Sequence, residues 1–203
     1  MIKPKFKSWP ASLVACCCLI SAVPAIAWGE GAFRKVVNAL TDTPAAVAVS
    51  AQMRIEVGFS PGLGAELLVI KTIHSASDSI LVLAYSFTSK PIAEALIEAA
   101  KRGVKVYAVL DKSQRAERYT SATFLANSGV SVKIDDSHAS AHNKIIIVDG
   151  RHTLTGSYNF TNAAASRNAE NVLTVWNNSD LAKAYDEDFR RHWNHATDYS
   201  AKY

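Results

Sequence analysis

From about residue 52 to the end, short apolar runs alternate with stretches in which apolar residues recur at helical spacing. Most of the runs are rich in Val, Ile and Leu, which is typical of strands covered on both faces. They predict strands at residues 54–59, 79–85, 104–110, 130–134, 145–148, 153–155 and 172–176. Helical spacing predicts helices at residues 65–77, 90–102, 119–128 and about 180–194. Because helices alternate with apolar strands, the predicted fold class is α/β, with a mixed, largely parallel β-sheet flanked by helices on both faces.

Two of the predicted helices carry clear boundary signals. Ser89 is a cap for the helix at 90–102, with Pro91 in its first turn and Gly103 directly after its end. Ser179 or Asp180 is the predicted cap of the last helix.

The first 27 residues have the pattern of a secretory signal. Three lysines precede an apolar stretch at residues 9–27, which ends in Ala25-Ile26-Ala27, an A-x-A cleavage pattern. We therefore expect a signal peptide at 1–27 cut after Ala27, a linker or lead-in at 28–51, and one domain at 52–203. The expected location is periplasmic or secreted.

Two other fates of this leader stay open. Residues 13–16 resemble a lipobox ending in Cys16, although the residues after it remain apolar, where a lipidated terminus usually becomes polar. An uncleaved anchor is also compatible with the length of the apolar stretch. All three cysteines lie in the leader, so a chain cut after Ala27 has no thiol for catalysis or for binding a metal.

The formal net charge of +4 comes mainly from the leader. Without Lys3, Lys5 and Lys7, 19 basic residues face 18 acidic ones. Bulk charge therefore gives no argument for binding nucleic acid, and any attraction for phosphate must be local.

The candidate chemistry lies around the apolar run at 145–148. The sequence reads His142-Asn-Lys144, then the run, then Asp149, and after six intervening residues Gly156-Ser157-Tyr-Asn159. Side chains alternate along a strand, so His142 and Lys144 share a face, as do Ser157 and Asn159 if that segment is extended. An imidazole, an ammonium, a hydroxyl and an amide together suit a phosphate group. Asp149 would face the other way, which indicates a structural role.

This pattern resembles the phospholipase D superfamily, whose signature is His-x-Lys-x4-Asp followed downstream by Gly-Ser and Asn. The similarity extends from about residue 55 to residue 199 and looks most like the small bacterial endonuclease branch, which has one motif per chain and works as a dimer. The fold implied is a phospholipase D-like half-domain. The other segments that carry the resemblance are Val57–Pro61, Ala84–Thr88, Ala126–Gly129 and His192–Asn194.

The resemblance implies a role for each motif residue. His142 is the expected nucleophile, forming a phosphohistidine, and Glu170 matches the acidic partner that orients its ring. Lys144 and Asn159 are expected to bind phosphate oxygens, and Ser157 to support them or to hold Glu170. Asp149 and Gly156 are structural members of the motif.

One histidine cannot easily attack phosphorus and also protonate the leaving oxygen. A two-fold homodimer would supply a second His142, so we expect a site built from both chains. The other five histidines lack Lys and Asp companions. Neither a cofactor nor a metal is expected, because His138 and His142, although four residues apart, lie in a loop and a strand rather than on a helix.

A basic loop at Lys112, Arg115 and Arg118 follows a predicted strand end, where it would either bind backbone phosphates or be solvated.

The leading functional hypothesis is an exported, metal-independent endonuclease on DNA, with RNA as a further substrate. The alternatives are a phospholipase D that acts on phosphatidyl lipids, and an inactive module that binds nucleic acid or phosphate.

Overall fold

The computed structural model of the protein describes residues 53–117 and 120–201. The predicted signal peptide, the lead-in and Arg118 therefore lie outside the described residues. No helix within the described ranges combines the length and the apolar character needed to cross a membrane.

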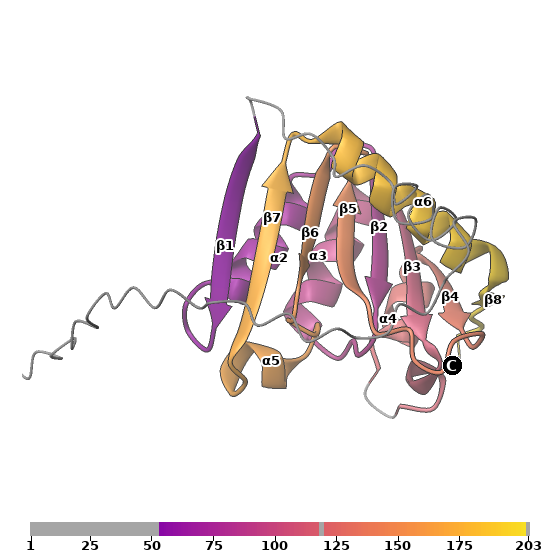
Figure 1. The fold of residues 1–203 in the computed structure, drawn as a ribbon. Coiled ribbons are helices and arrows are strands. Elements are labelled where there is room, and N and C mark those ends of the chain that lie inside the picture. Colours follow the sequence, from indigo (N-terminus) through magenta and orange to yellow (C-terminus); the bar gives the residue numbers. More distant parts are fainter. Residues whose placement is uncertain (1–52, 118–119, 202–203) are drawn as a thin grey trace, which may run out of the picture. The chain divides into compact units, whose positions relative to one another are not determined.

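Eight strands of the described part form one sheet, in the order β1-β7-β6-β5-β2-β3-β4-β8 (Figure 1). Each predicted strand is present, within about two residues of its expected bounds. The strands are β1 (Arg54–Ser60), β2 (Ser79–Ala84), β3 (Lys105–Asp111), β4 (Ser131–Asp135), β5 (Lys144–Val148), β6 (His152–Gly156), β7 (Glu170–Trp176) and β8 (Thr197–Asp198).

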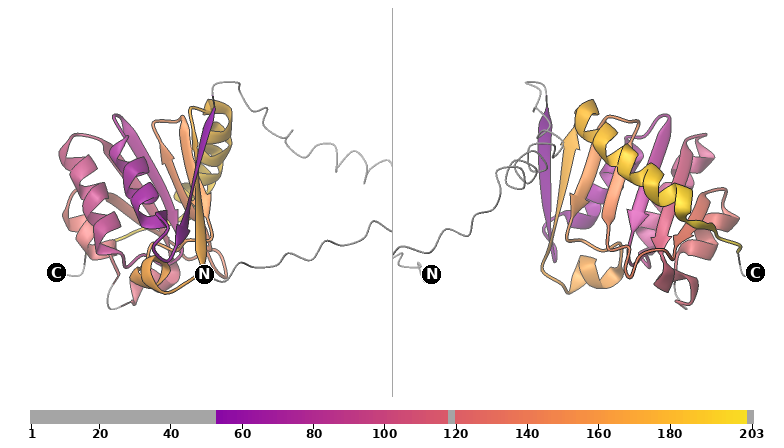
Figure 2. Two further views of the ribbon diagram at one scale, coloured as in Figure 1. Left: turned by 90° about the vertical axis from the view of Figure 1, so that its left-hand side faces the viewer. Right: turned by 45° about the vertical axis from the view of Figure 1, so that its right-hand side comes forward.

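Helices cover both faces of this sheet, as predicted. Figures 1 and 2 show α2 and α3 on one face and α6 running obliquely across the other. The helices are α2 (Ala65–His74), α3 (Lys90–Lys101), α4 (Ala122–Asn127), α5 (Asn162–Ser166) and α6 (Ser179–His195), with a short 3-10 turn at Lys112–Arg115.

The sheet is mixed, but the prediction that it is largely parallel is wrong. Only β2 with β3 and β3 with β4 pair in parallel, and the other five pairings are antiparallel. The physical reason is the length of the connections in the second half of the chain. Three residues join β5 to β6, a loop too short for the crossover that parallel neighbours require.

Apart from Lys144 at its start, β5 is apolar, and it lies in the middle of the sheet, buried along its whole length. Ile146 and Val148 face the core under α2 and α3, whereas Ile145 and Ile147 pack with Phe189 of α6. Burial on both faces explains why this strand has no polar alternation.

The structure shows which residues cap the two helices whose starts were predicted. The Ser89 side chain accepts a hydrogen bond from the backbone N–H of Ile92, as predicted for the start of α3. For α6 the prediction is off by one residue, because Asn178 is the cap and its side chain accepts from the N–H of Leu181 at 3.0 Å. An asparagine caps a helix as well as a serine does.

Apart from Asp149, the motif residues come together at one edge of the sheet, where β2 and β6 end and β5 and β7 begin, the lower edge in Figure 1. Lys144 at the start of β5 pairs with Ala84 at the end of β2. Gly156 at the end of β6 pairs with Val172 near the start of β7. The residues just before β5, just after β6 and at the start of β7 therefore converge.

Candidate active site

His142 and Lys144 lie next to each other at this edge. The His142 side chain is exposed, whereas Lys144 is only 7% exposed. The Lys144 ammonium lies 3.0 and 3.3 Å from the two ring nitrogens of His142 and donates to the His142 carbonyl oxygen at 2.8 Å. Burial lowers the pKa of Lys144 below its usual value, and the negative charge of Glu170 offsets part of that effect.

Tyr85 packs against this pair from the end of β2. Its ring centroid lies 4.5 Å from that of His142, and the Lys144 ammonium is 5.2 Å from the Tyr85 ring. The Tyr85 backbone N–H donates to the carbonyl oxygen of Asn143 at 2.9 Å. Tyr85 therefore fixes the orientation of the imidazole by ring contact and also holds the ammonium by a cation–π contact.

Ser157 and Glu170 form a second polar pair at the same edge. The Ser157 hydroxyl donates to the Glu170 carboxylate at 2.5 Å and accepts from the backbone N–H of Asn171 at 3.1 Å. The Asn168 amide donates to the other carboxylate oxygen at 3.1 Å. Within the described part of this chain, no hydrogen bond joins Glu170 to His142, so their predicted partnership is not seen here, although Glu170 is close enough to influence Lys144.

The side-chain oxygen of Asn159 is buried and has no hydrogen-bond partner among the described residues. An amide oxygen only accepts hydrogen bonds, so the group of Asn159 that suits a phosphate oxygen is its NH₂.

Gly156 lies where the chain turns from β6 into this site. A Cβ atom there would collide with the carbonyl oxygen of Asn171 and would lie 2.9 Å from Cα of Val172. Only glycine allows β6 and β7 to approach this closely, which brings Ser157 to Glu170.

Asp149 lies at the opposite edge, after β5. Its carboxylate accepts hydrogen bonds from the backbone N–H groups of Ser77, Asp78 and Ser79 and from the Ser77 hydroxyl, at 2.7–3.2 Å. Burial alone would raise the pKa of Asp149, but these hydrogen bonds outweigh it and lower the pKa below its ordinary value. Asp149 thus ties the end of β5 to the start of β2.

We expect Asp149→Asn to lower the free energy of unfolding by about 1–3 kcal/mol at neutral pH, because three backbone N–H groups and one hydroxyl lose a charged acceptor. The folded pKa is below the unfolded value of about 4, so this contribution is complete above pH 4 and is lost as the pH falls through the folded value. Urea midpoints should differ equally between wild type and variant at pH 7 and pH 5, and by less below pH 4. A difference that persists unchanged at low pH would contradict this role.

The other histidines do not join His142. His74 is exposed, with an ion pair to Glu98 at 3.4 Å, and His152 is buried and accepts from the N–H of Asn177. His138, His192 and His195 instead gather around Asp135, a cluster that the sequence reading missed. The signal was present in the spacing of His192 and His195, which are three apart on one helix and therefore share a face.

The basic loop after β3 is occupied with internal contacts. Lys112 donates to the carbonyl oxygen of His138 at 3.0 Å, and Arg115 contacts Asp136 at 3.2 Å and the Thr197 hydroxyl at 2.7 Å. These contacts favour a solvated surface loop over a phosphate-binding site.

Several known proteins are similar to this chain in sequence, in fold or in both. Residues 69–193, more than half of the chain, match the family model described as "Cardiolipin synthase, PLD-like domain". A phospholipase D of Rickettsia conorii is 38% identical over 132 residues, which is 65% of this chain and 66% of that protein. Mitochondrial cardiolipin hydrolase of Xenopus laevis is 34% identical over 118 residues, 58% of this chain and 56% of that protein. Each match thus spans less than two thirds of the curated relative.

Among solved structures, the phospholipase D family member Nuc from Salmonella typhimurium is 40% identical, with a TM-score of 0.72. That match covers 73% of this chain and 99% of Nuc. NucT from Helicobacter pylori, at 20% identity and a TM-score of 0.67, shares the fold. The chain therefore belongs to the phospholipase D superfamily, in its Nuc-like branch.

Proposed function

We propose that the protein is an exported, metal-independent phosphodiesterase that cuts DNA without strong sequence preference, with RNA as a further substrate. The observation that carries this proposal is the exposed His142 imidazole held against the buried Lys144 ammonium, with Ser157, Asn159 and Glu170 at the same sheet edge. Such an edge offers a nucleophile, a fixed positive charge and neutral donors to one phosphate group.

In the first step, a ring nitrogen of His142 attacks phosphorus with its lone pair. The bond from phosphorus to the leaving oxygen breaks, and that oxygen takes a proton from a second imidazole, the partner subunit's His142. The product is a phosphohistidine on one chain and a free hydroxyl end of the substrate. In the second step, the partner's His142 removes a proton from water, the resulting hydroxide attacks phosphorus, and the bond to the His142 nitrogen breaks.

The surrounding residues act on charge and orientation. Lys144 and Asn159 bind the non-bridging oxygens, where negative charge increases in the transition state. Ser157 holds Glu170, and the negative charge of Glu170 favours the charged form of the buried Lys144 ammonium. When the substrate is bound, Glu170 is the acidic partner that orients an imidazole.

The need for two imidazoles supports a homodimer. The described surface also offers a place for a second copy, because three large apolar side chains are exposed from the end of β1 to the start of α2: Phe59, Leu63 and Leu67. An exposed apolar patch of this kind commonly marks a protein–protein contact.

A subunit-mixing experiment tests the shared site. After wild-type and His142→Ala chains are unfolded and refolded together in equal amounts, about one quarter of the dimers contain two wild-type chains. We expect only these dimers to cut, so activity per wild-type chain should fall by about half. Unchanged activity per wild-type chain would show that each subunit works alone.

The substrate is tested by parallel assays on supercoiled plasmid and on phosphatidylcholine vesicles. Nicking of the plasmid without lipid turnover is expected. The second candidate is a phospholipase D, which the names of the Rickettsia and Xenopus relatives favour, and lipid turnover without nicking would establish it in place of the nuclease. If neither substrate is cut and wild type and His142→Ala bind DNA equally, the protein is a binding module.

Metal independence follows from the chemistry of the site, since the Lys144 ammonium supplies the positive charge that a metal ion would otherwise provide. Nicking should continue in excess EDTA at a temperature at which the chelated protein remains folded. If the chelated protein is folded but does not nick DNA, and magnesium restores nicking, the proposal of metal independence is contradicted.

Export rests on the leader pattern in residues 1–27. Amino-terminal sequencing of the protein from a periplasmic fraction should begin at Trp28. A chain that begins at Met1, or a lipidated Cys16, would replace this proposal.

A further inference from the structure

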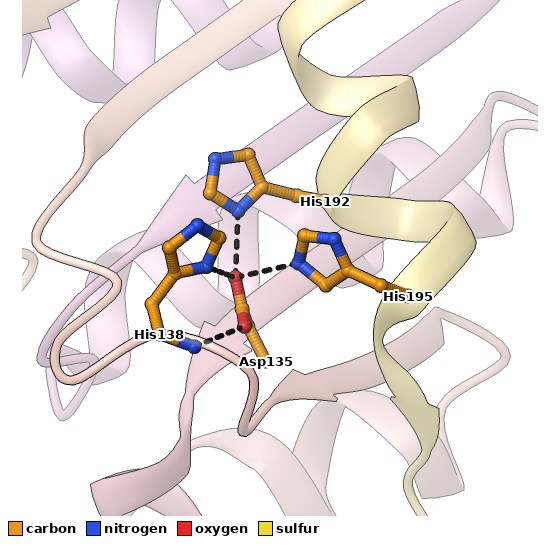
Figure 3. Close-up of side chains that lie close together, drawn as sticks. All are labelled: Asp135, His138, His192 and His195. Atoms are coloured by element: carbon orange, nitrogen blue, oxygen red, sulfur yellow. Dashed lines mark hydrogen bonds and ion pairs between the residues drawn. The ribbon is translucent and has the colours of Figure 1, made fainter.

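Three imidazoles converge on a single buried carboxylate at the end of β4 (Figure 3). Oδ2 of Asp135 lies 2.8 Å from Nδ1 of His138, 2.6 Å from Nδ1 of His192 and 3.2 Å from Nε2 of His195. Asp135 is completely buried. These four residues, the His₃Asp cluster, are separate from the motif of His142.

The arrangement of the carboxylate points to a ligand. Its other oxygen, Oδ1, accepts from the backbone N–H groups of Ser137 and His138 at 3.1 and 3.3 Å, which fixes the carboxylate plane. Oδ2 then faces three ring nitrogens, more than its lone pairs can accept as ordinary hydrogen bonds. Metal sites orient their carboxylates by such outer hydrogen bonds.

The spacing of the ligand atoms also fits a small ion. One atom from each residue lies within 4.8 Å of the others. Tetrahedral zinc, with bonds of about 2.0–2.2 Å, needs ligand atoms about 3.3 Å apart, so shifts of a few tenths of an ångström to about an ångström would complete the site.

We propose that Asp135, His138, His192 and His195 bind one zinc ion. Three imidazole nitrogens and one carboxylate oxygen suit zinc, whereas magnesium and calcium prefer oxygen ligands. Four protein ligands fill a tetrahedron and leave no position for a reactive water, so the ion is structural. The half-exposed His138 gives the ion a path to the site.

The ion would join three segments that are distant in sequence. Asp135 ends β4, His138 lies in the loop that leads to His142, and His192 and His195 lie in the last turn of α6. The same loop is tied to the end of β3, where the Asp111 carboxylate accepts from the N–H of Ala141 at 2.8 Å. Zinc at the cluster would therefore fix α6 to the sheet and steady the loop that carries His142.

The test uses the full chain, stripped of metal by chelator and dialysis and then titrated with zinc chloride by calorimetry. We expect about one zinc ion per chain and a rise in melting temperature of at least about 5 °C. Magnesium chloride should give neither result. Neither readout depends on catalysis, so failure of the nuclease proposal would not affect this test.

Variants assign the binding to the cluster. His195→Gln and His138→Gln change the two more exposed ligands, so the protein should still fold, and each should weaken zinc binding by at least about tenfold. His74→Ala, an exposed histidine outside the cluster, is the matched control and should bind as wild type does.

Two results would overturn the proposal. One is a melting temperature that zinc does not change, which would leave the cluster as imidazoles hydrogen-bonded to a carboxylate. The other is zinc binding that persists unchanged in both glutamine variants.

Discussion

Replacing His142 with alanine should lower the rate of plasmid nicking by at least about 10³-fold, because the attacking atom is removed and the remaining groups only bind the phosphate. The variant should fold normally. His142 is exposed, and its ring contacts Tyr85 at a tilted angle and the Lys144 ammonium. In a shared site, the substitution also removes the leaving-group acid, since each imidazole serves in both roles across the dimer.

The comparison protein is His74→Ala, which removes an exposed histidine far from the motif and should cut at the wild-type rate. Melting curves of the two variants should coincide within about 1 °C, since surface changes have small effects on stability. Nicking by His142→Ala within about tenfold of wild type would exclude this residue as the nucleophile.

Replacing Lys144 with methionine should lower nicking by about 10²- to 10³-fold, because a fixed charge next to the phosphate is lost. Stability should not fall, and it should rise slightly. The Lys144 ammonium is buried, so removing it removes a desolvation cost, and methionine keeps most of the side chain's volume. Activity should thus fall while stability rises, as expected where a charge needed for the reaction is buried away from water.

The matched control is Lys105→Met, at the start of β3 and so at the opposite edge of the sheet, where the lysine is exposed and ion-paired with Asp78. It should change neither nicking nor the urea midpoint by a measurable amount. If Lys144→Met unfolds the protein, or cuts at the wild-type rate, then Lys144 serves the fold rather than the reaction.

The fold was predictable wherever a local pattern decides it. The apolar run at β5 indicated a strand buried on both faces, and the capping serine at α3 indicated a helix start. Strand direction was harder to predict, because apolar composition does not distinguish a buried parallel strand from a buried antiparallel one. The short connection after β5 was the better signal, since it allows only a hairpin.

The candidate site was predictable where its residues are close in sequence. His142, just before β5, and Lys144, its first residue, lie side by side, and Ser157 and Glu170 meet because neighbouring strands place them at one edge. The His₃Asp cluster was not predictable in the same way. Asp135 and His192 are 57 residues apart and meet only because α6 crosses back over the sheet to the end of β4. The spacing of His192 and His195 places those two on one helix face, but no local spacing connects them to Asp135 or His138.

The central claim is that His142 forms a covalent bond to phosphorus and that water then breaks it. Each displacement inverts the configuration at phosphorus, so two in series retain it. Cleavage of a DNA substrate with one chiral phosphorothioate linkage in ¹⁸O-labelled water measures this outcome directly. The account predicts net retention with wild-type protein, and net inversion would show that water attacks the phosphorus directly, without a phosphohistidine.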